Sequence, residues 1–274
     1  MILDGKKLSL EILDNLRLQR SQFKQLKIAA FLIGKESEKL SFLKIKQKFA
    51  ESLNIDFKIY EIDASWKRKK IRKYISQIIR HKTINAGIIQ LPLANTLPAQ
   101  YILNSIPPKK DIDCLSSKLL GRFYTDIYII RPPVVEVVDF LKNKYNWDFN
   151  GKEVLVVGYG NLIGKPLTHY LAKEKATVII ANSQTNLDKF LISADFIISG
   201  AGQPKIINQC KKGAILVDFG YAIVDGKISG DFYFERLKNK ASFITPTPGG
   251  TGPILVAKLF ENFFKLLNKQ WMVI

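Results

Sequence analysis

The sequence has few of the residues that several common kinds of site require. It contains two cysteines, Cys114 and Cys210, and two histidines, His81 and His169, in 274 residues. Two distant cysteines do not suggest a disulfide framework or a zinc site. Two histidines give little support to a Ser-His-Asp triad or to a histidine-rich metal site. We therefore expect no bound metal and a reduced, cytoplasmic environment.

Long apolar segments are missing as well. The stretch MILDGKKLSL has no long apolar core before a cleavage site, so no signal peptide is expected. No stretch approaches the roughly 20 apolar residues that a membrane-spanning helix needs. With 47% hydrophobic and 24% charged residues, the composition is typical of a globular protein that can bury a sizeable core.

Acidic residues are the third shortage, because 24 Asp and Glu face 42 Lys and Arg, for a net charge of +18. In the densest basic run, SWKRKKIRKYISQIIR, helical spacing would bury a stripe made of Ile71, Ile75, Ile78 and Ile79. We interpret this run as a helix with a solvated basic face, and nucleic acid is not expected as a partner. A weaker role, the attraction of an anionic substrate or cofactor, stays open.

Strand-like and helix-like segments alternate along the chain in two blocks. The first block holds the strand segments KIAAFLIG, DFKIYEI and AGIIQLPL, and the second holds EVLVVGYG, ATVIIAN, FIISG and AILVDFG. Such alternation predicts parallel sheets covered by helices, and hence the α/β fold class. Helices are also expected from about Leu162, over RPPVVEVVDFLKNKY, and over ILVAKLFENFFKLL. The natural division between the two α/β units lies near residue 120.

One lysine lies where a helix would be expected to carry an apolar residue. In SFLKIKQKFAESL, helical spacing aligns an apolar stripe of Phe42, Ile45, Phe49, Ala50 and Leu53. Lys46 projects into the middle of that stripe. Apolar surroundings disfavour the charged form of a lysine, so its pKa is expected to fall toward neutrality, as a base acting near neutral pH requires. The alternative is a lysine whose ammonium group extends along the helix into solvent.

A glycine-rich loop follows the first strand of the second block. VLVVGYGNLIGKPL places Gly158, Gly160 and Gly164 between a strand and the start of a helix. Glycines allow a tight turn there, and the free N–H groups of a helix N-terminus attract a pyrophosphate. The spacing is one residue longer than the usual dinucleotide fingerprint. In this context the loop predicts nucleotide binding, and the alternative is a packing turn.

Three further segments carry candidate side chains. Gln90 ends the strand GIIQLPL at its carboxyl edge, where open α/β sheets bind ligands, although a glutamine can also simply cap a strand. Asp111 and Asp113 are two apart in a loop at another such edge, where acids commonly form turns. TPGGTGP is either a binding loop with exposed amides or a rigid entry to a helix.

The order of these segments is similar to that of a known family. GIIQLPL, PPKKDID, VVGYGNLIGKP and PTPGGTGP, together with ILDGKKLS and VDGKISGDFYFE, resemble the bifunctional methylenetetrahydrofolate dehydrogenase/methenyltetrahydrofolate cyclohydrolase family over essentially the whole chain. The resemblance implies an α/β folate-binding catalytic domain made of residues 1–120 and 249–274. Inserted in it would be a Rossmann-type domain with a doubly wound parallel sheet, residues 121–248. A homodimer is implied as well.

The resemblance also implies two successive activities in one-carbon metabolism. An oxidoreductase step would convert 5,10-methylenetetrahydrofolate to 5,10-methenyltetrahydrofolate with NAD(P)+, and a hydrolase step would give 10-formyltetrahydrofolate. NADP is the nominal cofactor, and NAD stays open. Two alternatives remain beside this one: another two-domain NAD(P)-dependent dehydrogenase with a lysine base, of the shikimate type, or a basic nucleic-acid-binding protein on a retired enzyme fold.

Roles for individual residues follow from the family pattern. Lys46 would be the acid/base of the cyclohydrolase step, Gln90 the residue that tunes it, and Asp113 the acid that binds the pterin. The folate would be contacted by Phe42, Pro248, Gly249 and Gly250. The dinucleotide would be contacted by Gly158, Tyr159, Gly160, Ser183 and Tyr221.

The chain departs from the family pattern at several positions. Phe42 stands in place of a tyrosine, so the ring is kept and the hydroxyl is lost. Cys114 replaces a glycine, and RPPVV replaces a Pro-x-Thr-Pro-x-Gly segment. Tyr159 and Gln184 occupy positions where arginines often hold the 2′-phosphate of NADP. We therefore expect weak discrimination between NADP and NAD.

Overall fold

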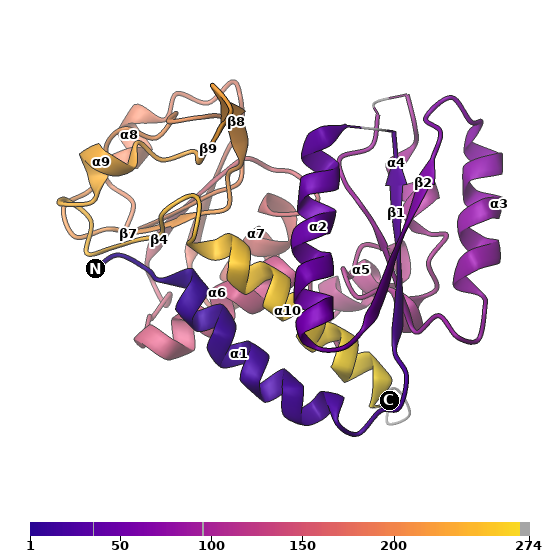
Figure 1. Cartoon of the computed structure of the whole chain (residues 1–274). Coiled ribbons are helices and arrows are strands. Elements are labelled where there is room, and N and C mark those ends of the chain that lie inside the picture. Colours follow the sequence, from indigo (N-terminus) through magenta and orange to yellow (C-terminus); the bar gives the residue numbers. More distant parts are fainter. Residues whose placement is uncertain (35, 95, 269–274) are drawn as a thin grey trace. The chain divides into compact units, whose positions relative to one another are not determined.

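The computed structural model describes residues 1–34, 36–94 and 96–268 (Figure 1). The chain forms two compact units. Unit 1 consists of Met1–Leu10 and Val134–Leu255, and unit 2 consists of Glu11–Pro133 and Val256–Ile274. The functional division expected from the sequence, with boundaries after residues 120 and 248, stays a prediction, since compactness and function need not share their boundaries.

Unit 2 contains a three-stranded parallel sheet with the strand order β2-β1-β3. Its strands are β1 (Lys27–Ile33), β2 (Asp56–Ile62) and β3 (Ala86–Ile89). Its helices are α2 (Ser37–Ser52), α3 (Arg68–Ile79), α4 (Ala99–Leu103), the 3-10 helix η1 (Pro108–Lys110) and α5 (Ser117–Tyr124). It shares α1 (Gly5–Arg20) and α10 (Thr251–Leu267) with unit 1. The three strands expected in the first block are all present.

The sheet of unit 2 is covered on both faces, with α2 on one side and α3 on the other (Figure 1). The strand order requires this arrangement, because the right-handed crossover from β1 to β2 and the one from β2 to β3 run in opposite directions. On the α3 side, Ile71, Ile75 and Ile79 are fully buried in one cluster with alternate residues of β1. Ile78 is partly buried against the same cluster, so the stripe predicted for the basic helix is largely correct.

The apolar stripe predicted for α2 is wrong in one respect. Ile45 is 50% exposed, whereas Leu43 is fully buried together with Ala50. The sequence offers two overlapping apolar stripes on this helix, and packing on the sheet selects the one that contains Leu43. Lys46 lies three residues after Leu43 and four before Ala50, so helical spacing still places it along the buried side of α2.

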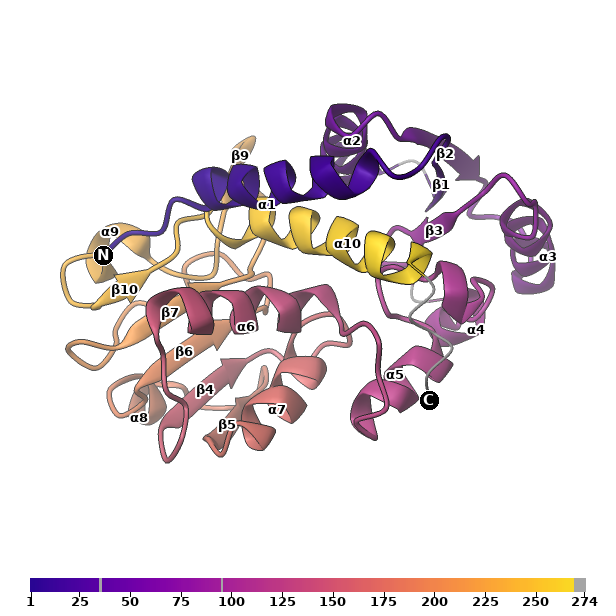
Figure 2. The same ribbon diagram turned by 90° about the horizontal axis from the view of Figure 1, so that it is seen from below.

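Unit 1 contains a five-stranded sheet, all parallel, with the order β10-β7-β6-β4-β5 (Figure 2). Its strands are β4 (Glu153–Val157), β5 (Thr177–Ala181), β6 (Phe196–Ser199), β7 (Ile215–Asp218) and β10 (Phe243–Ile244). A separate hairpin pairs β8 (Ala222–Val224) with β9 (Lys227–Ser229). The helices are α6 (Pro133–Tyr145), α7 (Gly164–Lys173), α8 (Asp188–Leu191) and α9 (Phe234–Leu237).

If β4, β5, β6, β7 and β10 are numbered 1 to 5 as they follow one another along the chain, their order in the sheet is 2-1-3-4-5. This is a doubly wound order. The direction of winding reverses between β4 and β6, and ligands of such sheets bind at the carboxyl ends of the strands at this switch point. The four strands expected in the second block are present, and the predicted α/β class with a Rossmann-type unit is confirmed. The hairpin and β10 were not expected, because strands of two or three residues carry no readable periodicity.

The N-terminal residues extend the edge of this sheet. Ile2 forms a parallel bridge with Ile244, and the Leu3 N–H donates to the Ile244 carbonyl at 3.0 Å. Gly5 lies so close to the loop before α10 that a Cβ there would overlap the Gly250 carbonyl. These contacts explain why the first ten residues belong to unit 1.

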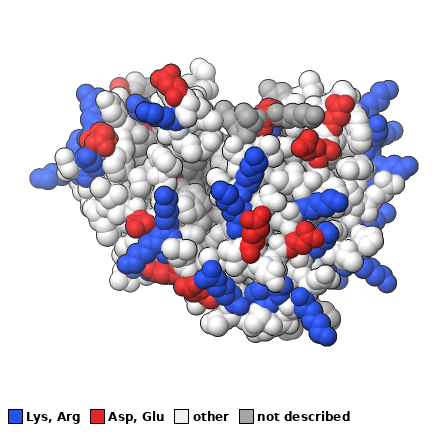
Figure 3. Space-filling model, in the orientation of Figure 1, with Lys and Arg blue, Asp and Glu red and all other residues white. Residues whose placement is uncertain are grey.

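The basic residues are spread over the face of the protein that Figure 3 shows. Figure 3 shows Lys and Arg across the visible face, with Asp and Glu between many of them. Residues 64–110 are the exception, because they include ten Lys and Arg and no acid. Within the described residues, no helix is long and apolar enough to cross a membrane.

Candidate functional site

Lys46 and Gln90 are in direct contact in unit 2. The Lys46 Nζ donates a hydrogen bond to the Gln90 Oε1 at 3.1 Å. Gln90 directly follows β3, and its backbone N–H donates to the Phe31 carbonyl of β1 at 3.0 Å. Its side chain is buried, and the Nε2 donates to the Leu91 carbonyl at 2.8 Å. The amide is therefore fixed with its oxygen toward the lysine.

Asp113 belongs to the same group of side chains. Burial raises the pKa of its carboxyl, and the positive charge of Lys46 lowers it in part. The two side chains are thus close enough to interact electrostatically although 67 positions separate them in the sequence. A lysine, an amide oxygen and a carboxyl together can move a proton and can bind a planar ring with several N–H donors.

Asp111 has a different environment from Asp113. It is 3% exposed, and its carboxylate accepts the backbone N–H of Ser116 at 2.7 Å and that of Leu115 at 3.1 Å. Burial raises the pKa of Asp111 to about 6 in spite of these hydrogen bonds. Asp111 therefore shapes the loop that carries Asp113.

The same loop is also held by a residue of α10. The Asn262 Nδ2, on α10, donates to the Ile112 carbonyl at 3.1 Å and to the Arg131 carbonyl at 2.9 Å. Cys114 is buried and has a φ of +57°, in the left-handed region that a glycine adopts without strain. This conformation explains why a glycine suits the position in the family pattern. Phe42 lies one turn before Lys46 on α2 and is partly buried.

The glycine loop of unit 1 lies at the switch point of its sheet. Gly158 has a φ of +93°, and a Cβ at Gly164 would overlap the Gly158 carbonyl, so both positions require glycine. Gly160 and Tyr159 are exposed beside the N-terminus of α7. Exposed amides at a helix start, with the backbone open to close approach, fit the pyrophosphate of a dinucleotide. The residues present therefore suit the cofactor that the sequence predicts.

Other expected dinucleotide contacts lie at neighbouring strand ends of unit 1. Ser183 is exposed in the turn after β5, and Tyr221 is partly buried just before β8. Lys165, which was not among the expected residues, lies near this loop, with its Nζ 5.7 Å from the centre of the Tyr159 ring. Its place in the first turn of α7, directly after the third glycine, is the signal that could have identified it.

The loop with Pro248, Gly249 and Gly250 also belongs to unit 1, whereas Lys46, Gln90 and Asp113 belong to unit 2. Gly249 has a φ of +98°, and its carbonyl accepts the Gly5 N–H at 3.0 Å. A Cβ at Gly250 would overlap the Pro246 carbonyl. The shape of this loop therefore depends on its glycines.

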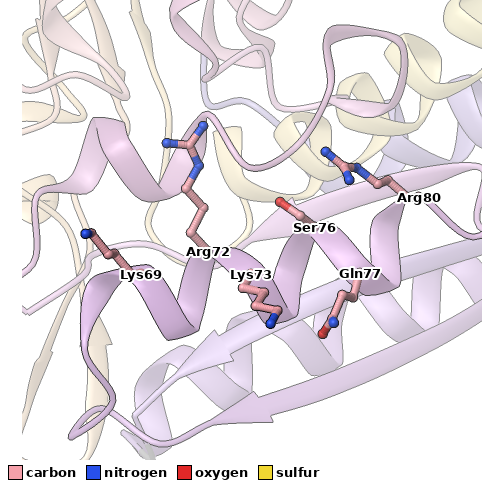
Figure 4. A pocket seen from close by; sticks show the side chains of 6 residues that line it. All are labelled: Lys69, Arg72, Lys73, Ser76, Gln77 and Arg80. Atoms are coloured by element: carbon pink, nitrogen blue, oxygen red, sulfur yellow. The ribbon is translucent and has the colours of Figure 1, made fainter.

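Two surface hollows lie at the basic helix α3. One of them, shown in Figure 4, is lined by Lys69, Arg72, Lys73, Ser76, Gln77 and Arg80. The other lies at the start of the helix and is lined by Ala64, Ser65, Trp66, Lys67, Arg68, Lys69, Thr96 and Leu97. Neither is lined by a candidate residue. Across the described part of the chain, no group of three or more His, Cys, Asp or Glu is placed to hold a metal ion.

Comparisons with known proteins identify the family of the chain. Residues 3–113 match the model of the tetrahydrofolate dehydrogenase/cyclohydrolase catalytic domain, and residues 133–271 match that of the NAD(P)-binding domain of the same family. The bifunctional protein FolD of Clostridium perfringens is 32% identical over 97% of this chain and 99% of its own length.

Solved structures give the same result. The bifunctional FolD enzyme of Campylobacter jejuni has a TM-score of 0.90 at 29% identity, covering 98% of this chain and 99% of that one. The Trypanosoma brucei enzyme, in complex with NADP and an inhibitor, has a TM-score of 0.91 at 25% identity and covers 100% of this chain and 99% of its own. The chain belongs to the tetrahydrofolate dehydrogenase/cyclohydrolase family.

Proposed function

We propose that this chain carries out both reactions of its family. It oxidises 5,10-methylenetetrahydrofolate to 5,10-methenyltetrahydrofolate with NADP+ and hydrolyses the product to 10-formyltetrahydrofolate. The observation that supports the assignment most strongly is the contact of Lys46 with Gln90, with Asp113 close enough to interact with the same lysine. Family membership over nearly the whole chain favours this function over the shikimate-type and nucleic-acid-binding alternatives.

The oxidation needs a hydride acceptor and a substrate held in place. A dinucleotide in this site would supply, in its nicotinamide, the acceptor for the hydride that leaves the methylene carbon. Amides of the loop that starts at Gly158 would hold its pyrophosphate at the switch point. Asp113 binds the N–H groups of the pterin edge, and the ring of Phe42 packs against the substrate. The product carries a positive charge on the methenyl bridge.

The hydrolysis needs a group that moves protons. Water adds to the methenyl carbon, and Lys46 accepts the proton that the water loses. The hydroxyl group so formed loses its proton to solvent as the bond from this carbon to N5 breaks, N5 takes a proton from Lys46, and the formyl group stays on N10. One proton is released overall, because the cation and water become a neutral formyl compound. The Gln90 Oε1 accepts a hydrogen bond from Lys46 and fixes the position of the amine.

An absorbance assay tests both steps. Purified protein is mixed with 5,10-methylenetetrahydrofolate and either NADP+ or NAD+, and the formation of reduced cofactor is followed. Decay of added methenyltetrahydrofolate is measured separately. We expect both signals, and loss of the second in Lys46→Met. A protein that shows neither signal would contradict the proposal.

The oligomeric state, the location and the metabolic role are inferred from the family pattern. We propose that the protein is a homodimer in the cytoplasm and serves one-carbon metabolism there. Light scattering on the purified protein measures the dimer mass, and fractionation of the cells that make it measures the location. A monomeric mass at micromolar concentration would contradict the first point.

A further inference from the structure

Two aspartates that the proposed mechanism does not use lie buried at the carboxyl edge of the unit 1 sheet. Asp218 ends β7 and is 2% exposed, and Asp231 follows β9 and is fully buried. They pack so tightly against glycines that a Cβ at Gly220 would overlap the Asp231 carboxyl, and a Cβ at Gly230 would overlap that of Asp218. We call Asp218 and Asp231 the carboxylate pair.

Asp231 shapes the loop that follows β6. Its carboxylate accepts the Ser199 Oγ–H at 2.5 Å, the Ala201 N–H at 2.8 Å and the Gln203 N–H at 2.7 Å. The Gly202 N–H adds a longer hydrogen bond of 3.3 Å. One buried side chain therefore fixes the backbone of residues 201–203 and the side chain at the end of β6.

Asp218 connects three other segments. Its Oδ1 accepts the Gly220 N–H at 2.7 Å and the Asp231 N–H at 3.3 Å. Its backbone N–H donates to the Thr245 Oγ1 at 2.7 Å, and its carbonyl accepts the Thr251 hydroxyl at the start of α10. Asp218 thus joins the segment that leads to Tyr221 to the segments on both sides of the Pro248 loop.

The loop held by Asp231 lies beside the glycine loop at the switch point. A Cβ at Gly158 would come within 3.0 Å of the Gly200 carbonyl and 3.1 Å of the Ala201 backbone. A Cβ at Gly202 would lie 3.5 Å from the Tyr221 carbonyl. The glycine loop after β4, the loop after β6 and the segment before β8 therefore touch one another, and a dinucleotide bound at the switch point would contact all three.

We propose that Asp231 and Asp218 are positioning residues of the dinucleotide site, which hold the loops after β6 and β7 in the arrangement that binds the cofactor. The inference rests on the proposed function, because it takes the dinucleotide to bind at the switch point. Neither carboxylate touches the cofactor, and both act through backbone amides.

The arrangement makes cofactor binding depend on pH. Burial, and next the negative charge of Asp231, raise the pKa of Asp218 to about 7. Its hydrogen-bonding neighbours Thr245, Thr251, Gly220 and Phe232 are neutral, so Asp231 is the charged group among its contacts. The arrangement of loops around Asp218 therefore keeps a proton that a solvated Asp218 would release. Its stability falls as the pH rises from the ordinary pKa of an aspartate to about 7, and it stays at the lower level above that pH.

The test is a titration of the full-length protein with NADPH, followed by fluorescence, at about pH 6 and about pH 8.5. We expect the Kd of the wild type to rise with pH, by at most about tenfold per unit up to about pH 7, and to level off above it. Asp218→Asn carries a neutral amide at both pH values, so its Kd should change much less. The 2′-phosphate of the ligand also titrates, with a pKa of about 6, but equally for both proteins. The difference between the two proteins in the change of Kd with pH therefore measures the contribution of Asp218.

A second variant tests Asp231 and leaves its own carboxylate in place. Ser199→Ala removes one of the donors to its carboxylate, and we expect a Kd for NADPH that is several-fold higher, with an unchanged KM for the folate substrate. If Asp218→Asn keeps the pH response of the wild type, or Ser199→Ala binds NADPH as the wild type does, the inference is overturned. A wild type that binds no NADPH at either pH would overturn the proposed function, and this inference with it.

Discussion

The side chain of Lys46 is held by an amide oxygen, and this residue-scale arrangement has a direct chemical consequence. An amide oxygen accepts a hydrogen bond and does not itself titrate, so Gln90 positions the lysine without competing for its proton. The nearby Asp113 adds a carboxyl whose ionisation depends on the lysine charge. In the proposed mechanism the lysine therefore handles the protons, and the other two side chains set its position and its electrostatic surroundings.

Replacement of Lys46 by methionine should abolish the hydrolase step. Methionine keeps the length and the apolar stem but cannot exchange a proton, and acid/base catalysis typically contributes about 10²–10⁴-fold. The decay of methenyltetrahydrofolate measures the loss, and NADPH binding should be unchanged. Lys48→Met, at an exposed position on the same helix, is the matched control and should keep full activity. Retention of more than about a tenth of the rate in Lys46→Met would contradict the role.

Replacement of Asp113 and replacement of Asp111 in the KDID loop should affect different properties of the protein. Asp113→Ala should raise the KM for folate strongly and leave the melting temperature and NADPH binding nearly unchanged. Asp111→Ala should lower the melting temperature instead, because it leaves the buried amides of Leu115 and Ser116 without an acceptor, at about 1–3 kcal/mol for each. Thermal unfolding and substrate kinetics separate the two effects. Equal losses of folate affinity without unfolding in Asp111→Ala would show that Asp113 has no special role.

At the scale of elements, we expect the turn between β4 and α7 to set the preference between NADP and NAD. An arginine fork normally holds the 2′-phosphate of NADP, and this turn presents Tyr159 with Lys165 beside it. The turn after β5 contributes Ser183 and Gln184, which donate hydrogen bonds but carry no charge. One exposed lysine gives a weaker and more easily screened attraction than an arginine fork.

We expect kcat/KM to favour NADP over NAD by less than about a hundredfold at physiological salt, or roughly 2.7 kcal/mol. Lys165→Gln should reduce the preference further, by removing the cation nearest Tyr159. Lys173→Gln, at the other end of α7, is the control for net charge and should have no effect. A preference above a hundredfold that survives Lys165→Gln would show that another cation binds the phosphate.

Helix α3 carries the strongest local charge, and its aromatic neighbours are already occupied. Lys70 lies 3.7 Å from the centre of the Trp66 ring, and Arg72 lies 4.6 Å from that of Tyr101. Single-stranded nucleic acid binds through free aromatic faces combined with basic grooves. The protein's own cations cover the rings of Trp66 and Tyr101. The surface of α3 therefore keeps its charge but offers these rings poorly for the stacking of bases.

We therefore predict weak, unspecific binding of nucleic acid that disappears at physiological salt. A gel shift with a short single-stranded RNA should be visible at low ionic strength and absent at about 0.15 M salt, where the Debye length is about 8 Å. The triple variant Lys69→Gln, Arg72→Gln, Lys73→Gln should remove the low-salt shift and leave both enzyme activities intact. A clear shift at physiological salt would restore the nucleic-acid interpretation.

For the whole molecule, the sequence alone determined the α/β class, most of the strands and the position of the glycine loop. These features depend on local properties: apolar periodicity, the conformational freedom of glycine, and the N–H groups of a helix start. The order of short motifs along the chain was enough to indicate the family. Strand order and the loops that meet at the switch point are not local, and they appear only in the folded sheet.

Tertiary structure decided the features that join distant segments. Packing on the sheet buries Leu43 rather than Ile45 on α2. It also places Lys46 in contact with Gln90, which lies 44 positions later in the sequence. The tertiary structure gave Asp111 the backbone N–H groups of Leu115 and Ser116 as partners and placed Asp113 near Lys46, although the two aspartates are nearly adjacent in the sequence. It also buried the carboxylate pair among the amides of several loops. The reason is physical, because burial and hydrogen bonding depend on which chain segments pack together, and local sequence patterns do not contain that information.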